Sequence, residues 1–309
     1  MTHAGLHHVT AISGPARRNF DFYTRLLGLR FVKKTVNFDD PGTYHFYYGD
    51  EAGNPGTILT FFPWEHVAPG RVGVGQTSET AFRVPAASLG YWAHRFVEKG
   101  VPHETVTKRF GESVLAFKDP DGMRLSLVGV AGAEAEPGWS SGEIPVEHAI
   151  RGFHGVTLLI ENGARTGAIL TDVLGFREAG REGAITRYAT DAPLGAVVDL
   201  HEAAGFLPGR QGGGSVHHVA FRAADDAAQA AMAKRLAEHH GLQATEQKDR
   251  NYFRSIYFRE PGGVLFEIAT DEPGFAADEP VETLGQALKL PAFLEPHRSR
   301  IEAVLPELA

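Results

Sequence analysis

Two pairs of adjacent histidines occur in nearly the same phrase at distant points of the sequence, residues 5–10 (GLHHVT) and 214–219 (GSVHHV). Imidazole nitrogens bind metals and transfer protons near neutral pH. Both phrases are rich in apolar and β-forming residues, which predicts a strand. Because side chains alternate along a strand, we expect His7 and His8, and likewise His217 and His218, to point to opposite faces. Only one histidine of each pair should then face a given pocket.

Each histidine phrase opens a larger repeat, and an altered copy stands at residues 152–157 (GFHGVT). In the first repeat, a strand over 6–12 is followed by helical spacing over 16–27 and by three β-rich runs. The same order returns from residues 80, 155 and 216. The sequence therefore predicts an α+β fold of four βαβββ modules in two domains.

The order of the modules suggests where the domains lie. Residues 1–130 contain modules one and two, and residues 151–271 contain modules three and four. Residues 131–150 are rich in Gly, Ala, Glu, Ser and Pro without periodicity, which is typical of a linker. Residues 272–309 belong to no repeat and include an expected helix over about 296–305. This tail either caps a pocket or packs on the surface.

Superposing the repeats shows which residues take equivalent positions. On the first strand of each module these residues are His8, Glu79, Gly155 and His218. On the closing strand they are Thr60, Ser126, Asp199 and Glu267. Modules one and four together supply two imidazoles and one carboxylate, and Thr60 is a fourth corner that does not ligate. Such a facial set of three ligands leaves positions open for substrate and dioxygen on Fe(II).

The other pairings of modules make poorer metal sites. Modules three and four would give one histidine and two carboxylates, and modules two and three would give no histidine. We therefore expect one metal site, built across both halves of the chain, and a degenerate second cavity. His154 falls at the register of His7 and His217, so we do not expect it to be a ligand.

A structural role is the ordinary explanation for a lone histidine on a strand. We assign that role to His45, His94, His103, His148 and His201. Glu267 differs, because it lies among apolar residues where a carboxylate is costly to bury unless it is paired or binds a metal.

The overall composition limits the function. With 309 residues, 43% of them hydrophobic and 22% charged, the chain is typical of a globular protein of two domains. Its net charge of -8 and the lack of a basic cluster argue against a nucleic-acid partner. The absence of cysteine excludes disulfides and thiolate ligands. No apolar run of roughly 20 residues and no signal peptide is evident, so we expect a cytoplasmic protein without a membrane partner.

Several stretches together resemble one family. Paired βαβββ modules with ligands on first and last strands resemble the vicinal oxygen chelate superfamily. Within that superfamily, the sequence is most similar to the hydroquinone ring-cleaving dioxygenases. The similar stretches are residues 6–10 (LHHVT), 31–35 (FVKKT), 44–48 (YHFYY), 55–57 (PGT), 147–154 (EHAIRGFH), 249–253 (DRNYF) and 257–267 (YFREPGGVLFE). The resemblance covers nearly the whole chain.

The resemblance implies an enzyme that uses Fe(II) and dioxygen to open the ring of a small para-diphenol. It implies His8, His218 and Glu267 as the metal ligands, the same three that the repeats select. It also implies roles beside the metal or at the substrate for His7, Thr10, His217, Arg250 and Tyr257. Mn(II) is an alternative metal, zinc or nickel can replace iron in purified protein, and a homo-oligomer is possible.

Three other functions stay open at this point. An extradiol dioxygenase acting on catechols would use the same three ligands. A glyoxalase-like lyase is less favoured, because Thr60 replaces the fourth protein ligand of such a site. A binding or resistance protein that sequesters a small molecule would need no metal cluster. For Arg250, a surface ion pair is the alternative to a role in the site.

Overall fold

The computed structural model describes residues 4–140 and 142–308 and contains all four expected modules. The elements of module one are β1 (Leu6–Ser13), α1 (Ala16–Asp21), the π-helical turn η1 (Phe22–Leu26), β2 (Arg30–Asn37), β3 (Asp40–Gly49) and β4 (Ile58–Pro63). Those of module two are β5 (Gln76–Pro85), η2 (Ala86–Ser88), α2 (Leu89–Lys99), β6 (Thr107–Arg109), β7 (Glu112–Lys118) and β8 (Arg124–Val130). The predicted βαβββ order is confirmed for both.

The second half of the chain repeats this order. Module three consists of β9 (Gly152–Ile160), α3 (Ala164–Asp172), β10 (Arg177–Glu182), β11 (Ile185–Ala189) and β12 (Val197–Glu202). Module four consists of β13 (Val216–Ala223), α4 (Asp226–His240), β14 (Lys248–Asp249), β15 (Arg254–Arg259) and β16 (Leu265–Thr270). Short helical turns fill the linker and the tail, at η3 (Ala133–Ala135), η4 (Val146–His148), η5 (Phe275–Ala277), η6 (Val281–Thr283), η7 (Glu295–His297) and α5 (Arg298–Glu302).

Local sequence signals set the ends of the longest helices. The side chain of Asp225 caps α4 by accepting a hydrogen bond from the amide of Ala228. Both α4 and α2 end at a glycine in the left-handed region, Gly241 with φ 64° and Gly100 with φ 67°. Glycine takes this conformation without steric cost, so the chain can turn back toward its sheet at these points.

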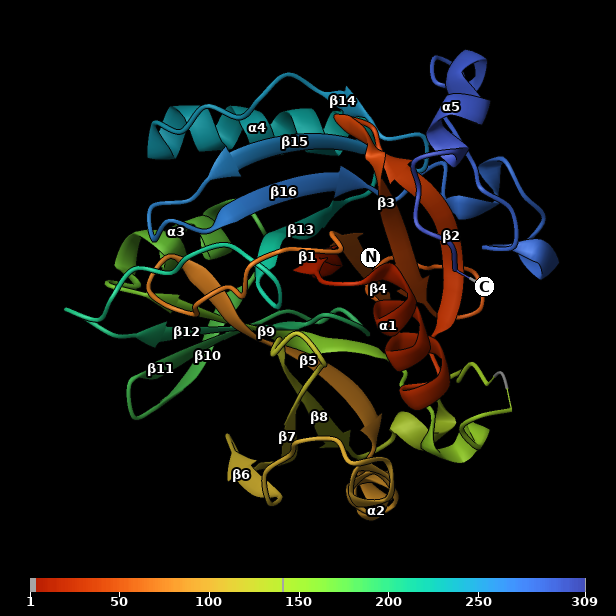
Figure 1. The fold of residues 1–309 in the computed structure, drawn as a ribbon. Coiled ribbons are helices and arrows are strands. Elements are labelled where there is room, and N and C mark those ends of the chain that lie inside the picture. The colour runs from red at the N-terminus through yellow and green to blue at the C-terminus, as the bar shows by residue number, and fades with distance from the viewer. Residues whose placement is uncertain (1–3, 141, 309) are drawn as a thin grey trace.

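The strands form two eight-stranded sheets that cross the order of the chain (Figure 1). One sheet joins modules four and one in the order β14-β15-β16-β13-β1-β4-β3-β2. The other joins modules three and two in the order β10-β11-β12-β9-β5-β8-β7-β6. Each sheet therefore takes one module from either side of residues 131–150. The division into domains 1–130 and 151–271 stays a prediction. The hydrogen-bonded sheets group the modules differently, as one with four and two with three.

The register of the strands confirms the alignment of the repeats. In every module the residue two positions after the aligned first-strand residue pairs with the aligned closing-strand residue. These pairs are Thr10 with Thr60, Ala81 with Ser126, Thr157 with Asp199, and Ala220 with Glu267. The antiparallel contact of β1 with β13 joins two such units in one sheet, and β5 with β9 joins the other two. Equivalent residues of two modules thus face one shared cavity in each sheet.

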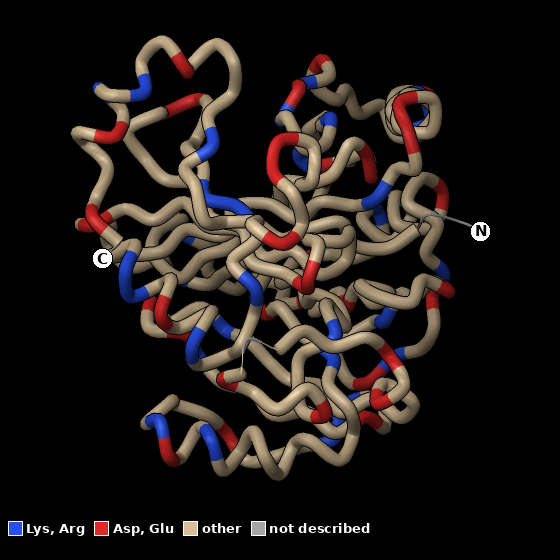
Figure 2. Tube along the Cα trace, turned by 90° about the vertical axis from the view of Figure 1, so that its right-hand side faces the viewer, with Lys and Arg blue, Asp and Glu red and all other residues tan. Residues whose placement is uncertain are grey.

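Charged residues of both signs are interspersed along the trace on the side shown in Figure 2. Within the described residues, no helix is long and apolar enough to cross a membrane. The helices instead cover the outer faces of the sheets, as α4 does over β15 and β16 in Figure 1. Their apolar sides and the sheets enclose one large core that includes Trp92, Phe153 and Phe266.

The tail packs along β2 and is held there by a buried lysine. Lys33 is fully buried, and its Nζ lies 2.6 Å from Asp278 Oδ1 and 2.5 Å from Glu279 Oε2. Tyr252 also donates a hydrogen bond to Asp278, over 3.0 Å. Further along, Leu288 forms a β-bridge with Lys34. The tail is therefore attached to the wall of the sheet that carries modules one and four.

Replacing Lys33 should destabilise the protein strongly. In Lys33→Ala, two tail carboxylates lose their buried counter-charge, and breaking such a pair costs about 3–5 kcal/mol. Urea unfolding should show this loss in the free energy of unfolding. Lys34→Ala removes a neighbouring, partly exposed lysine and should change stability by no more than about 0.5 kcal/mol. Equal effects of the two variants would show that Lys33 does not hold the tail.

Candidate metal centre

Three side chains from three strands meet in the sheet of modules one and four. His8 on β1, His218 on β13 and Glu267 on β16 are all buried, and their ligand atoms lie within 4.8 Å of one another. Glu267 Oε2 is 2.9 Å from His218 Nε2 and 3.3 Å from His8 Nε2. Among the described residues, no other group of His, Asp and Glu has this arrangement.

The donor atoms of this cluster fit a divalent cation. Glu267 Oε1 accepts a hydrogen bond from the Ser255 hydroxyl, but Oε2 is buried without a hydrogen bond from any described residue. A buried oxygen in that state is costly unless a cation or another donor satisfies it. Burial would raise the pKa of Glu267, yet His8 and His218 hold that pKa well below its usual value. The carboxylate is therefore ionised and available as a ligand.

Two β-bulges orient the histidine pairs, and they overturn one expectation from the sequence. The register of β1 with β13 shifts between Leu6 and His8, which makes His7 the extra residue on β1. It shifts again between His218 and Val216, which makes His217 the extra residue on β13. The Nδ1 atoms of His7 and His8 lie 2.9 Å apart, and those of His217 and His218 lie 2.8 Å apart. The expected alternation is wrong for His217 and His218, because both line the same cavity.

This geometry gives each candidate ligand a neighbouring histidine as support. A ligand imidazole that binds through Nε2 carries its hydrogen on Nδ1 and needs an acceptor there. Burial, and then the neighbouring His8, lower the pKa of His7 to about 3. Burial, and then His218, lower the pKa of His217 to about 4. Both are neutral near pH 7, so their Nδ1 atoms can accept the hydrogen bonds of His8 and His218.

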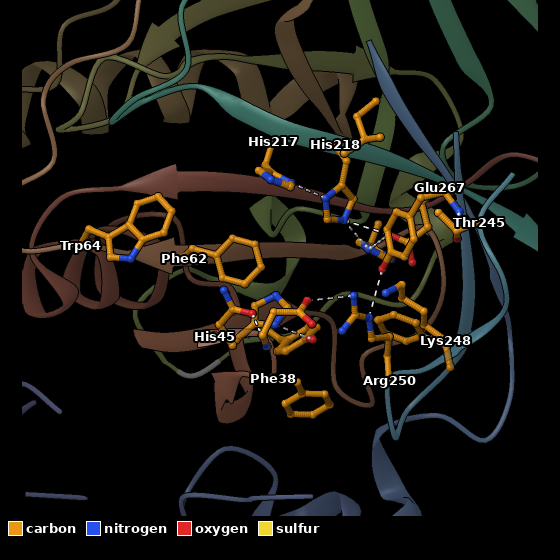
Figure 3. Close-up of a pocket in the computed structure, with 17 residues that line it drawn as sticks. Phe38, His45, Phe62, Trp64, His217, His218, Thr245, Lys248, Arg250 and Glu267 are labelled. Atoms are coloured by element: carbon orange, nitrogen blue, oxygen red, sulfur yellow. Dashed lines mark hydrogen bonds and ion pairs between the residues drawn. The ribbon is translucent and has the colours of Figure 1, made fainter. Parts of the chain in front are cut away.

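A cavity of about 410 Å³ opens beside the three side chains (Figure 3). Its walls are largely aromatic, formed by Phe38, Tyr47, Phe62, Trp64, Phe253 and Tyr257. Its size and lining suit a small aromatic ring. Phe38 also contacts Phe293 edge to face, with 6.2 Å between ring centroids. The tail thus supports one wall of the cavity from behind.

Arg250 and Tyr257, both expected at the site, lie together on the cavity wall. Arg250 Nε donates to the Tyr257 hydroxyl over 3.3 Å, and Arg250 Nη2 lies 3.2 Å from Asp39 Oδ2. Burial, and then Glu267, raise the pKa of Tyr257 well above its usual value. Burial alone would lower the pKa of Arg250, but Tyr257 and Asp39 raise it. The wall therefore presents a fixed positive charge and a protonated phenol.

The remaining expected residues lie behind the wall. Thr10 is fully buried and accepts a hydrogen bond from Thr60, 2.8 Å away. His7 packs against Phe253 with 5.1 Å between ring centroids. Neither is among the residues that line the cavity. His7 and Thr10 are thus not placed to contact a substrate directly. They contact other residues of the site instead, His7 through His8 and Thr10 through Thr60.

Sequence reasoning missed His45, which it assigned a structural role. His45 lines the cavity and bonds Thr60 and Tyr47 through its two ring nitrogens, each at 2.9 Å. A signal for it was available in the repeats. Tyr47 pairs with Thr60 in module one as Tyr257 pairs with Glu267 in module four. Extending the alignment to the third strand of each module would have brought Tyr47 and His45 to the site.

The other sheet contains the expected degenerate cavity, where ion pairs fill the space. Arg187 binds Asp199 through two hydrogen bonds of 2.8 Å and also contacts Glu112 at 2.6 Å. His154 reaches the same Glu112 at 2.9 Å. The volume left is about 10 Å³. The guanidinium of Arg187 therefore fills the space between the equivalent positions of this sheet, whereas the corresponding space beside the His-His-Glu cluster is open.

Paired βαβββ modules that enclose a buried 2-His-1-carboxylate cluster define a class of metal-dependent proteins with open coordination positions. The chain belongs to the Glyoxalase/Bleomycin resistance protein/Dioxygenase superfamily, whose family model matches residues 5–127 and 152–268.

Full-length relatives narrow this class. The chain is 47% identical over 298 residues to MhqO of Bacillus subtilis, and the match covers 96% of this chain and 94% of that one. The name of MhqO gives ring-cleaving dioxygenase as a provisional activity. It is 36% identical over 298 residues to the chlorohydroquinone/hydroquinone 1,2-dioxygenase of Sphingobium indicum, covering 94% and 92%. A crystal structure of a Bacillus subtilis protein, provisionally titled a dioxygenase, superposes with a TM-score of 0.94 at 46% identity, covering 99% and 98%.

Replacing His217 should weaken metal binding without removing a ligand. In His217→Leu, the Nδ1 hydrogen of His218 loses its acceptor, and such support is worth about 10- to 100-fold in metal affinity. Competition with a chelator would measure the affinity for Fe(II). His154→Gln alters the equivalent position of module three and should leave the affinity unchanged. An unaltered affinity in His217→Leu would show that His217 does not support His218.

Proposed function

We propose that this protein is an Fe(II)-dependent dioxygenase that cleaves the ring of hydroquinone-type aromatics, with His8, His218 and Glu267 as the ligands. The observation that carries the proposal is the three-residue cluster with Thr60, a non-ligand, at the fourth corner. Three protein ligands leave positions for a diphenol and dioxygen. The named activity of the Sphingobium indicum relative supports hydroquinones as the substrate class.

Bound Fe(II) would supply the chemistry that lets dioxygen react with the electron-rich ring. The chain's own residues bind and orient the substrate. The aromatic wall around Phe62 and Phe253 stacks on the ring and keeps water away from it. The guanidinium of Arg250 stabilises negative charge on the substrate oxygens. The Tyr257 hydroxyl, whose pKa is raised, remains a proton donor at the same wall.

A specific observation separates this function from a glyoxalase-like lyase. Thr60 donates to Thr10 and is held by His45, so its hydroxyl is committed to hydrogen bonds within the protein. The fourth protein ligand is therefore missing. A catechol-cleaving extradiol enzyme is the second candidate, because the same cluster serves a diphenol with adjacent hydroxyls. Mn(II) remains the alternative metal.

Metal-free protein reconstituted with Fe(II) without oxygen should consume dioxygen when hydroquinone and air are added. We expect about one dioxygen per ring, since both its atoms enter the product. An oxygen electrode and absorbance of the ring-opened product would measure the reaction. His8→Ala should lose bound iron and oxygen uptake together. Catechol and a methylglyoxal–glutathione adduct are tested in parallel as alternative substrates.

The parallel substrates decide between the candidates. Faster oxygen uptake with catechol would favour the extradiol function. Turnover of the glutathione adduct without oxygen would favour the lyase. Full activity of a metal-free His8→Ala protein would overturn the proposed metal site.

A further inference from the structure

A chain of four hydrogen-bonded side chains runs from the cavity wall into the protein. Tyr47 and His45 line the cavity, and Thr60 and Thr10 are fully buried behind them. The Tyr47 hydroxyl lies 2.9 Å from His45 Nδ1, and His45 Nε2 lies 2.9 Å from Thr60 Oγ1. Thr60 in turn donates to Thr10 Oγ1 over 2.8 Å. Figure 3 shows His45 on the cavity wall, across from the histidines of β13.

The buried end of this chain is compatible with a tautomer of His45 that has its basic nitrogen at the cavity. A threonine hydroxyl has one hydrogen. When Thr60 donates that hydrogen to Thr10, Thr60 accepts from His45, and His45 Nε2 carries a hydrogen. In a neutral imidazole the other nitrogen is then the acceptor. In this tautomer the basic Nδ1 of His45 faces the Tyr47 hydroxyl, which donates to it.

His45 is neutral at rest, and its lowered pKa opposes protonation until a substrate anion lies beside the ring. Burial lowers its pKa well below the usual value, and the nearby imidazoles of His218 and His8 lower it further. Arg250 acts in the same direction and Glu267 acts against it. Tyr47 is the remaining titratable group beside the ring, and burial raises the pKa of its phenol. Tyr47 therefore keeps its hydrogen at rest.

The other imidazoles on the cavity wall and the guanidinium of Arg250 are committed elsewhere. His8 and His218 belong to the candidate ligands, and His217 bonds His218 through Nδ1. Arg250 is a permanent cation. Of the described imidazoles that line the cavity, His45 is the one whose two nitrogens bond groups outside the ligand cluster.

The internal symmetry of the site leads to the same residues. Tyr47 lies opposite Thr60 as Tyr257 lies opposite Glu267. The cavity therefore has a phenol on each side. One phenol is bonded to a guanidinium that cannot accept a proton, and the other is bonded to an imidazole that can.

We propose that Tyr47 and His45 form an acid–base pair that takes the hydroxyl proton of the diphenol when it binds and returns it to the ring-opened product. This inference rests on the proposed function. The substrate O–H bond breaks and its proton moves to Tyr47 Oη, while the phenolic hydrogen of Tyr47 moves to His45 Nδ1. The result is a substrate phenolate and a His45 imidazolium, with Nε2–H still donated to Thr60. No electrons are transferred, and the reverse transfer restores both residues.

The first test counts protons without turnover. The probe is 4-nitrophenol, which has one hydroxyl and whose phenolate absorbs visible light. It is titrated calorimetrically into iron-loaded protein without oxygen, at a pH where the free probe is protonated, in buffers of different ionisation enthalpy. The wild-type protein should bind it as phenolate and release almost no proton to the buffer. His45→Gln should release on the order of one proton per bound phenolate.

Tyr47→Phe should release the proton as His45→Gln does, because it removes the link between probe and imidazole. His103→Gln is the matched control, since His103 is a partly buried histidine of the other sheet that bonds the carbonyl of Val101. It should behave as the wild type. Binding of the probe as neutral phenol to the wild type, or equal proton release in wild type and His45→Gln, would overturn the proposal.

Turnover provides the second test. In His45→Gln and Tyr47→Phe, kcat with hydroquinone should fall about 10²- to 10⁴-fold, while KM and the iron content stay near those of the wild type. A wild type that binds iron but consumes no oxygen with any diphenol would refute the proposed function. Active wild type with unchanged kcat in both variants would refute the acid–base pair alone.

Discussion

The antiparallel pairing of β1 with β13 is the contact on which the whole site depends. It brings His8 and His218, which are 210 positions apart in the chain, to 3.4 Å between their Nε2 atoms. Because β4 pairs parallel with β1 and β16 parallel with β13, the same contact also positions Thr60 and Glu267. A bulge at each histidine pair then turns Nδ1 toward a neighbouring histidine. One pairing of strands thus determines both the cluster and its support.

The two sheets show how much the fold leaves to the side chains. Both have the same topology and the same four equivalent positions, but within the described residues the space between those positions is open in one sheet and almost filled in the other. In the sheet of modules two and three, Arg187 lies opposite Asp199, where Tyr257 lies opposite Glu267. The guanidinium satisfies the carboxylate directly and fills the space. Where a tyrosine takes that place, the carboxylate oxygen Oε2 of Glu267 faces imidazoles alone, which suits a cation instead.

The sequence predicts the modules and the cluster because both depend on a repeated register. His8, His218 and Glu267 could be matched since each is fixed by a glycine-led strand that recurs, and the chemistry favoured pairing module one with module four, which the structure confirms. The bulges could not be predicted, because an inserted residue changes which face a side chain takes without changing the apolar pattern. His45 was missed for a related reason: only its partners distinguish it, and Tyr47 and Thr60 reach it through the sheet.

Thr60 links the open metal site to His45. At the position where module four has the candidate ligand Glu267, module one has a hydroxyl that is hydrogen-bonded to Thr10 and His45. A carboxylate at that corner would complete a fourth protein ligand. The threonine instead leaves a coordination position open and holds one nitrogen of the imidazole, whose other nitrogen contacts Tyr47. Leaving a coordination position open and holding His45 beside Tyr47 are, on this reasoning, two consequences of one residue.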